Sequence, residues 1–422
     1  MASGLHKALV EKGLIIPHEE VALRSAAPQL AYKVIRPEQI AFVSYPYEWS
    51  FSQLQDAARV TLEIEKRALA RGLTLIDASA YNIQFLRGRP VLIDTLSLGP
   101  AVEGEPWPAY GQYCRHFLAP LALMAHRDVR LGQLLRVHLD GIPLDLADAL
   151  LPAGAKRRPG LFLHLHLHAK SQKRYEGRTS RAAAGRVGRS ALLGLVDSLD
   201  TATRRLRWRA GGTEWADYYR DTNYTPEGFE DKRRAVAEFI AEARPRTVWD
   251  LGANDGTFSR VAASAGALTV AFDVDPACVE KNYLRVRADN DPSLVPLLLD
   301  LTNPSPAAGW DNAERPALAE RGPADAVLAL ALIHHLAIGN NVPLEMIAGA
   351  LARLGRRLLV EFVPKSDAQV ARLLVTREDI FDRYTREEFE RTFSGPFEIV
   401  RRVPLAGSER ALYVMSRKGW RP

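Results

Sequence analysis

The sequence has 422 residues, of which 47% are hydrophobic and 25% charged, and these values are those of a globular protein with two or three domain cores. We expect no signal peptide, because the first residues lack a basic stretch followed by a sustained apolar core. No apolar run approaches the roughly 20 residues that a membrane helix needs, so we also expect no membrane span. The two cysteines, Cys114 and Cys278, form no metal-ligand spacing, and we expect a reduced, cytoplasmic setting and no metal site.

The N-terminal part is expected to be a domain of residues 1–205, mainly helical with some strands. Alternating residues predict a strand over residues 30–43. Ser50 and Gln53 have the spacing of a capping box, and the apolar stripe behind them predicts a helix that Gly72 ends.

Three polar residues follow with a distinctive order. Asp77 precedes Asn82, and a short hairpin then leads to Asp94 at the end of an apolar strand. This segment resembles the kinases related to aminoglycoside phosphotransferases and protein kinases. The resemblance implies a kinase-like fold in which Asp77 accepts the substrate proton, while Asn82 and Asp94 hold the magnesium of Mg-ATP.

The segment departs from the kinase pattern in two ways. Leu75 stands where these kinases usually have a histidine, and no glycine-rich phosphate loop precedes it. Lys33 is the candidate for a phosphate-contacting lysine. The fold could therefore be present without the chemistry, and Asp77, Asn82 and Asp94 could instead order loops.

A histidine run and a basic stretch end the N-terminal part. If the run is a strand, one face carries His164, His166 and His168; if it is a helix, His164 and His168 are still neighbours. Either arrangement could bind a metal ion, but the basic flanking residues favour packed or solvated histidines. Residues 151–210 carry 14 lysines and arginines against three acidic residues. This stretch could bind nucleic acid, but because it has few aromatic residues we favour a solvated connector.

The C-terminal part, residues 206–422, opens with an aromatic-polar cluster and a helix start. Thr225 and Pro226 are typical of the N-cap and first position of a helix. The cluster either covers a cofactor or packs the two domains together; it comprises Trp215, Tyr218, Tyr219, Asn223 and Tyr224.

The segment over residues 247–258 predicts a buried strand, a glycine turn and a helix. Its spacing is Asp-x-Gly-x-x-x-Gly, from Asp250 through Gly252 to Gly256, and an acid at this place suits a ligand with an ammonium group better than a phosphate. The motif resembles the first motif of class I S-adenosylmethionine-dependent methyltransferases. The resemblance implies a Rossmann-like α/β domain with a seven-stranded sheet.

Acidic residues follow the next two predicted strands. Asp273 ends the second strand, 23 residues after Asp250, where a carboxylate can accept from both hydroxyls of a ribose, whereas Asp275 is expected to cap the helix that begins at Pro276. Asp300 follows the third strand. The resemblance implies that S-adenosylmethionine is held by these acids and their neighbours: Asp250, Gly252, Asn254, Gly256, Asp273, Val274, Asp300 and Leu301.

The remaining pattern predicts a fourth strand over residues 326–333, a fifth over residues 358–362 and two closing strands near residues 397–403 and 411–416. His334 and His335 follow the fourth strand, where they are candidates for accepting a proton during methyl transfer or for shaping the pocket.

We therefore predict a methyltransferase acting on an oxygen or nitrogen nucleophile of an acceptor that the sequence does not specify. The alternatives are a bifunctional or kinase-like phosphotransferase and a non-catalytic module that keeps the cofactor fold.

Overall fold

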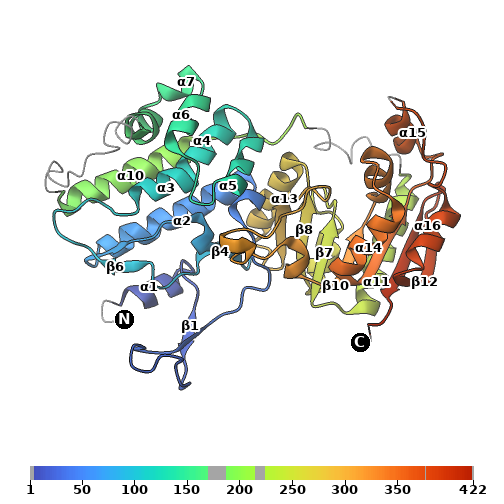
Figure 1. Cartoon of the computed structure of the whole chain (residues 1–422), viewed down its shortest axis with the longest axis horizontal. Helices are drawn as coiled ribbons and strands as arrows, with labels where there is room; N and C mark the ends of the chain where they lie inside the picture. The colour runs from blue at the N-terminus through green and yellow to red at the C-terminus, as the bar shows by residue number, and fades with distance from the viewer. Residues whose placement is uncertain (1–3, 170–186, 214–223, 376, 421–422) are drawn as a thin grey trace. The chain divides into compact units, whose positions relative to one another are not determined.

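The computed structural model describes residues 4–169, 187–213, 224–375 and 377–420. The chain divides into two compact units, residues 1–209 and 210–422, here called the N-terminal and C-terminal units (Figure 1).

The N-terminal unit is mainly helical, with three two-stranded antiparallel sheets among its described residues. The sheets pair β1 with β2, β3 with β6 and β4 with β5; the strands are β1 (His18–Glu20), β2 (Ile35–Pro37), β3 (Leu73–Leu75), β4 (Ile83–Leu86), β5 (Arg89–Leu92) and β6 (Leu98–Pro100). The helices are α1 (Leu5–Glu11), α2 (Phe51–Leu69), α3 (Tyr110–Tyr113), α4 (Ala119–His126), α5 (Leu134–Val137), α6 (Leu144–Leu150), α7 (Ala153–Lys156), α8 (Pro159–Leu161) and α10 (Arg189–Arg205).

The long helix α2 confirms the predicted capping box. The Ser50 hydroxyl accepts from the Gln53 amide, and the Gln53 side chain accepts from the Ser50 amide at 2.9 Å. The predicted strand over residues 30–43 is wrong in extent, because only β2 forms there and Lys33 pairs with Glu20 on the surface. These observations do not test the kinase resemblance, which stays a prediction.

The C-terminal unit is a mixed α/β domain around a seven-stranded sheet of order β12-β13-β11-β10-β7-β8-β9. Its strands are β7 (Thr247–Leu251), β8 (Leu268–Asp273), β9 (Leu294–Leu298), β10 (Ala324–Ala329), β11 (Gly355–Phe362), β12 (Phe397–Pro404) and β13 (Ala411–Arg417). Strands β7 to β11 run parallel, β13 is antiparallel to β11, and β12 is antiparallel to β13. This mostly parallel sheet is consistent with the predicted Rossmann-like methyltransferase fold.

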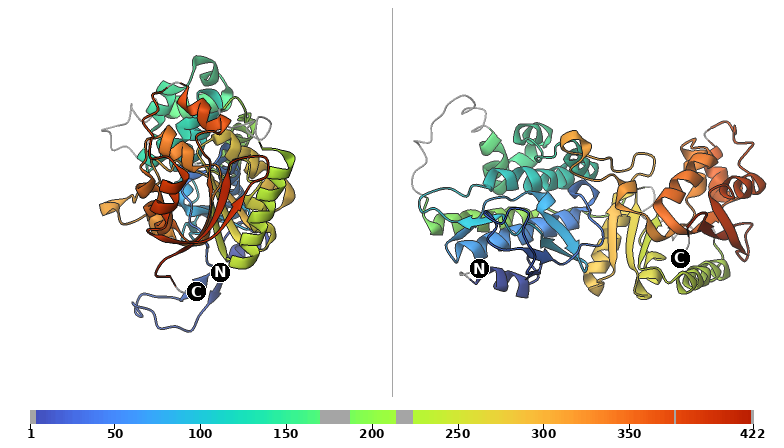
Figure 2. Two further views of the ribbon diagram at one scale, coloured as in Figure 1. Left: turned by 90° about the vertical axis from the view of Figure 1, so that its right-hand side faces the viewer. Right: turned by 60° about the horizontal axis from the view of Figure 1, so that its bottom comes forward.

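Helices cover both faces of this sheet, as the left view of Figure 2 shows with α11 on one side and the orange and red helices on the other. They are α11 (Pro226–Ala243), α12 (Ser259–Ser264), α13 (Pro276–Asp289), α14 (Leu344–Leu354), α15 (Ala368–Leu374) and α16 (Arg386–Phe393). The expected start of α11 is confirmed, because the Thr225 hydroxyl accepts from the Gly228 amide at 3.0 Å.

Strand alternation decides which side chains meet α11. Val248, Leu359 and Leu412 pack with Val236 and Phe239 in the core, whereas their neighbours in the strands point to the other face. Since side chains two residues apart share a face, Asp250 and Glu361 also lie on the α11 side of the sheet. This places two carboxylates under a helix whose buried stripe contains a lysine, Lys232.

Candidate functional site

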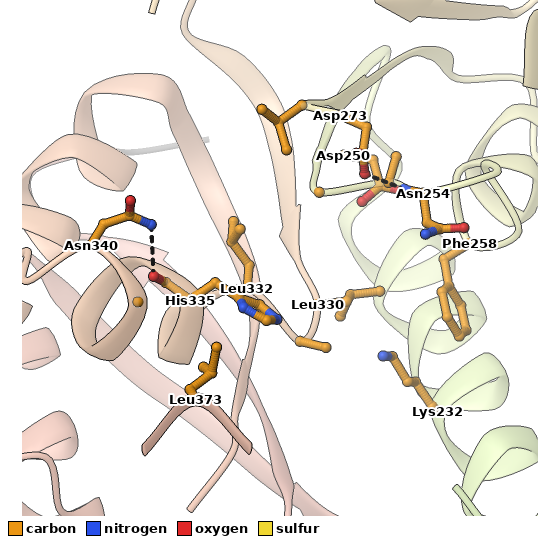
Figure 3. A pocket seen from close by; sticks show the side chains of 15 residues that line it. Lys232, Asp250, Asn254, Phe258, Asp273, Leu330, Leu332, His335, Asn340 and Leu373 are labelled. Carbon is orange, nitrogen blue, oxygen red and sulfur yellow. Dashed lines mark hydrogen bonds between the residues drawn. The ribbon is translucent and has the colours of Figure 1, made fainter. Parts of the chain in front are cut away.

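A cavity of about 370 Å³ opens at the carboxyl ends of the central strands β7, β8 and β10 (Figure 3). Ligands of open α/β sheets bind at this edge. The lining is largely apolar with a few polar groups, as is usual for a small-molecule site. It comprises Lys232, Asp250, Gly252, Ala253, Asn254, Phe258, Asp273, Val274, Leu330, Ala331, Leu332, His335, Gly339, Asn340 and Leu373.

The glycine turn after β7 forms one wall of the cavity. Gly252, Asn254 and Gly256 all have positive φ, at 75°, 50° and 79°, a region that glycine and asparagine enter most readily. The amides of Gly252 and Ala253 donate to the Phe272 carbonyl at 2.9 and 2.8 Å, so the turn is fixed to the end of β8.

Gly252 and Gly256 constrain the turn for different reasons. A Cβ at Gly252 would lie 3.3 Å from Leu332 at the cavity wall. A Cβ at Gly256 would lie 2.4 Å from the Asn282 amide nitrogen and 2.7 Å from Arg260, behind the turn. Gly256 is therefore needed for packing of the turn against α13 and does not line the cavity.

Asp273 holds the turn from the end of β8. One carboxylate oxygen accepts from the Asn254 amide at 2.7 Å, and the other accepts from the Asp275 amide at 2.8 Å. Burial raises the pKa of Asp273 to about 6, although these amide bonds oppose the shift. Each carboxylate oxygen has a second lone pair, so Asp273 can still accept from a ligand.

Asp250 lies at the end of β7 and is 2% exposed. One of its oxygens accepts from the Ser259 hydroxyl at 2.6 Å. Burial raises the pKa of Asp250 to about 6, while the Ser259 bond and the charge of Lys232 oppose the shift. Asp250 and Asp273 thus line the same cavity from the ends of two adjacent strands.

Lys232 is a site residue that the sequence analysis missed. Its ammonium lies 2.7 Å from a Glu361 oxygen and donates to the Tyr224 hydroxyl at 2.9 Å. It lies 4.7 Å from the ring centres of Tyr224 and Phe258, within the range of cation–π attraction. A lysine in the buried stripe of an amphipathic helix was the signal that could have identified it.

Glu361 and a second cation, Arg410, complete this buried network. Glu361 accepts from the Tyr224 hydroxyl at 2.6 Å and the Ala331 amide at 2.9 Å, and Arg410 lies 3.5 Å away. Arg410 also forms a two-point ion pair with Asp367, at 2.7 and 2.9 Å. Burial alone would raise the pKa of Glu361, but the charges of Lys232 and Arg410 outweigh it and lower that pKa.

The two candidate catalytic histidines have different positions. His335 lines the cavity, whereas His334 is 1% exposed and its ring centre lies 4.0 Å from that of His335. Within the described ranges, Nδ1 of His334 has no hydrogen-bond partner. Burial lowers the pKa of His335 to about 4, so both rings are neutral near pH 7.

The predicted end of the fourth strand is wrong. Strand β10 ends at Ala329, and a helical turn over His335–Gly339 follows. Ala331 adopts a positive φ of 52° with its amide bound to Glu361, and this bend takes the chain out of the sheet before the histidines.

The predicted adenine contacts lie outside the cavity lining. Asp300 is exposed, and one of its oxygens accepts from the amide and hydroxyl of Thr302. The backbone amide of Leu299, the residue before Asp300, donates to the Asp273 carbonyl at 2.8 Å. This bond holds the start of the Asp300–Leu301 segment beside the end of β8. The structure does not test their contact with a ligand.

In the N-terminal unit, the Asn82 and Asp94 side chains both contact the Ser97 hydroxyl, whereas the Asp77 carboxylate accepts from the Ser79 amide at 2.8 Å. Asp94 accepts from the Ser97 hydroxyl at 2.7 Å, and the Asn82 amide group contacts the same hydroxyl at 3.4 Å. The Ser97 carbonyl accepts from the Ile76 amide, next to Asp77. Among the described residues, no group of three or more histidine, cysteine or acidic side chains is placed to hold a metal ion.

The histidine run forms a helical turn over Phe162–Leu167, so the strand alternative is wrong. His164 is bound at 2.9 Å to both Tyr110 and Ser198, and His166 is bound to Asp148 at 2.8 Å.

The predicted aromatic cluster is described only in part. Tyr224 belongs to the buried network, and the residues that lie outside the described ranges are Trp215, Tyr218, Tyr219 and Asn223. In the described segments, no helix is long and apolar enough to cross a bilayer.

No family model matches the chain. The nodulation protein NoeA of Rhizobium meliloti (strain 1021) is 35% identical to it over 424 residues, covering 99% of this chain and 89% of that protein. The chain belongs to the NoeA family.

Solved structures of low similarity include three methyltransferase-containing proteins. The magnesium protoporphyrin IX methyltransferase ChlM of Synechocystis PCC 6803, with bound SAH, is 16% identical over 45% of this chain and 84% of its own, with a TM-score of 0.33. WbdD is 15% identical over 49% and 43% of the two chains, with a TM-score of 0.34. The methyltransferase domain of bacterial CtHen1 is 14% identical over 45% and 98%, with a TM-score of 0.33. TM-scores this low do not establish a relationship.

Proposed function

We propose that the C-terminal unit binds S-adenosylmethionine and transfers its methyl group to an oxygen or nitrogen nucleophile. The observation that carries this proposal is the pairing of Asp250 and Asp273 in one cavity, beside a glycine turn that Asp273 itself fixes. A cavity with two buried carboxylates suits a ligand with cationic and hydroxyl groups.

Each acid has a different role in this proposal. Asp273 accepts from the ribose hydroxyls with the lone pairs that the backbone leaves unused. Asp250 faces the cationic methionine end. Asn254 and Val274 flank the ribose, and Asp300 with Leu301 contacts the adenine.

Methyl transfer to a bound nucleophile needs alignment and exclusion of water more than covalent catalysis. His335, at the cavity wall, is the candidate proton acceptor for the methylated group, and His334 supports its ring from behind. A base with a pKa of about 4 is weak near pH 7, so we propose that His335 acts mainly by accepting a hydrogen bond from the acceptor.

Titration calorimetry of the full chain with S-adenosylhomocysteine tests the proposal. We expect saturable binding by the wild-type protein. Transfer of radioactive methyl groups to small molecules or macromolecules of an extract then separates an enzyme from a module that only binds. Absence of binding by correctly folded protein would reject the proposal.

A second candidate function, phosphoryl transfer by the N-terminal unit, is supported by the order of Asp77, Asn82 and Asp94 in the chain and by the contact of Asn82 and Asp94 with one hydroxyl, that of Ser97. In this proposal Asp77 accepts the substrate proton, and Asn82 and Asp94 hold magnesium. Full-length protein should bind ATP only with magnesium, and Asp94→Ala should abolish this binding while Asp140→Ala, on the surface, retains it. Equal binding by both variants would exclude the site.

A further inference from the structure

We propose that the N-terminal unit docks on an anionic membrane surface through one short helix, α8 together with the helical turn that continues it. The side chains that make the contact, here called the docking face, are Arg157, Arg158, Phe162, Leu163 and Leu167. The contact is peripheral, with the apolar side chains at the level of the lipid headgroups. The inference concerns the N-terminal unit and does not depend on the methyl transfer proposed for the C-terminal unit.

The helix of the docking face is apolar on its buried side and on its exposed side. It begins at Pro159 and continues through the turn Phe162–Leu167. On the buried side, Leu161 and Leu165 are 3% and 0% exposed. The three apolar members of the docking face are 42%, 49% and 41% exposed in chain order. A surface helix usually turns a polar side to water, so large apolar side chains at this place indicate a contact with another apolar phase.

The helix is fixed so that it cannot rotate to bury its exposed apolar side chains. His164 is 0% exposed and is bound at 2.9 Å to Tyr110 on α3 and to Ser198 on α10. Gly160 packs so closely against α10 that a Cβ there would lie 2.7 Å from the Cβ of Ala202. Because these contacts hold the buried side in place, the docking face stays directed away from the core of the unit.

The charge next to the apolar side chains is positive. From residue 149 to residue 169 the chain has three basic residues and no acidic residue. Lys156 pairs with Asp148, which His166 also contacts. Arg157 and Arg158 are exposed, and within the described residues neither forms an ion pair. Two uncommitted positive charges directly before an apolar surface are complementary to anionic lipid headgroups.

Arg158 is directly connected to the apolar part of the docking face. The Phe162 amide donates to the Arg158 carbonyl at 2.8 Å, so the two residues are one helical turn apart. The arginines and the apolar side chains can therefore meet the same surface together. In such a contact the arginines bind headgroup phosphates, and the apolar side chains leave water.

The size of the docking face favours a membrane over a second copy of the chain. Full burial of an aromatic side chain covers about 150–250 Å², so three large side chains that are each less than half exposed offer on the order of 250 Å². A stable dimer buries about 800 Å² on each partner. Shallow membrane contact needs less area, because apolar burial and attraction to anionic lipids act together.

Sedimentation of the full-length protein with lipid vesicles tests the proposal. One set of vesicles is phosphatidylcholine alone, and the other is equal parts phosphatidylcholine and phosphatidylglycerol. We expect wild-type protein to sediment with the anionic vesicles, to bind them less as salt is raised, and to bind phosphatidylcholine much more weakly. Leu163→Ser/Leu167→Ser should weaken binding to the anionic vesicles at least about tenfold, because it removes most of the apolar contact.

The matched control is Leu23→Ser/Leu30→Ser, which changes two leucines of the same unit that are 61% and 83% exposed but lie outside the docking face. This variant should bind like wild type. Arg157→Gln/Arg158→Gln tests the charges without changing an apolar side chain, and each arginine removed should weaken binding about fivefold. Circular dichroism verifies that every variant is folded, and the arginine variant decides if the leucine variant is not.

Three results would overturn the proposal. Wild-type protein could fail to bind the anionic vesicles, or it could bind both kinds of vesicle equally. The control and the docking-face variants could lose binding to the same extent. A third result is a dimer in analytical ultracentrifugation that Leu163→Ser/Leu167→Ser dissociates, without vesicle binding, and this would assign the docking face to a second copy of the chain.

Discussion

The ammonium of Lys232 and the carboxylate of Glu361 lie 2.7 Å apart, and their side chains are only 3% and 0% exposed. Removing one partner of a buried pair leaves the other charge unpaired, which typically costs about 3–5 kcal/mol. We expect Glu361→Ala to lower the free energy of unfolding by about this amount, although Asp367 still neutralises Arg410.

The matched control for this prediction is Glu242→Ala. Glu242 also forms an ion pair, with Arg401 at 2.9 Å, but the two side chains are 44% and 38% exposed, so the loss should be below about 1 kcal/mol. Urea denaturation followed by circular dichroism measures both variants. Equal losses would show that burial does not strengthen the Lys232–Glu361 pair.

Gly256→Ala should destabilise the protein more than Gly266→Ala. Both glycines have positive φ, at 79° and 90°, so either alanine adds about 1–2 kcal/mol of backbone strain. Only at Gly256 does the new Cβ meet other atoms, Asn282 at 2.4 Å and Arg260 at 2.7 Å, which should add roughly 1–3 kcal/mol. Thermal denaturation of both variants measures the difference; similar melting temperatures would mean that the Gly256 turn relaxes freely.

Ligand affinity should rise with pH between about pH 5 and pH 7. Burial raises the pKa of both Asp250 and Asp273 to about 6, above the value near 3.9 of an unfolded aspartate. As pH rises through 6 these groups ionise and attract the ligand's ammonium group, so affinity for S-adenosylhomocysteine at pH 5 should be roughly tenfold lower than at pH 7. Calorimetry at several pH values measures this effect.

The same shift has the opposite sign for stability without ligand. Between about pH 4 and pH 6 the folded protein holds protons on Asp250 and Asp273 that the unfolded chain has lost, so these groups make stability fall as pH rises through this window. Asp250→Asn should weaken both pH dependences. An Asp250→Asn protein with the wild-type pH profile of binding would assign that profile to other groups.

Asp273→Ala should weaken S-adenosylhomocysteine binding at least about tenfold, because it removes acceptors for ribose hydroxyls that are each worth about 1.5–3 kcal/mol. Asp291→Ala is a suitable control, since Asp291 also accepts from a backbone amide, that of Ser293 at 2.9 Å, but lies outside the cavity lining. Calorimetry of both variants, with circular dichroism to verify folding, measures the loss. Unchanged affinity in folded Asp273→Ala protein would remove Asp273 from the ribose contact.

Local sequence patterns were sufficient to predict the sheet and two of its acids. Asp250 and Asp273 each stand at the end of an apolar run, and residues typical of a turn or a helix cap come next. Because β7 and β8 are parallel, the two acids lie at the same edge of the sheet. Asp275 was correctly separated from Asp273, because its carboxylate caps α13 by accepting from the Ala277 amide at 2.8 Å.

Pairings between distant segments could not be predicted. The sequence marks Lys232 as unusual only through its place in the buried stripe of α11, and nothing local indicates Glu361 as its partner. The end of β10 was misplaced for a related reason. Leu330 and Ile333 are buried beyond the strand, so the apolar run continues through a bend that the Glu361 carboxylate stabilises.

The buried network has a consequence for exchange of segments between related proteins. Its charges come from α11, β11, the start of α15 and the loop before β13, and each is balanced by a partner on another segment. A chimaera that takes α11 from a relative without Lys232 would keep Glu361 but lose its lysine partner. The other cation near Glu361, Arg410, already pairs with Asp367. The four segments therefore fit best as a set, and recombination within this unit should yield the most stable protein when all four come from the same parent.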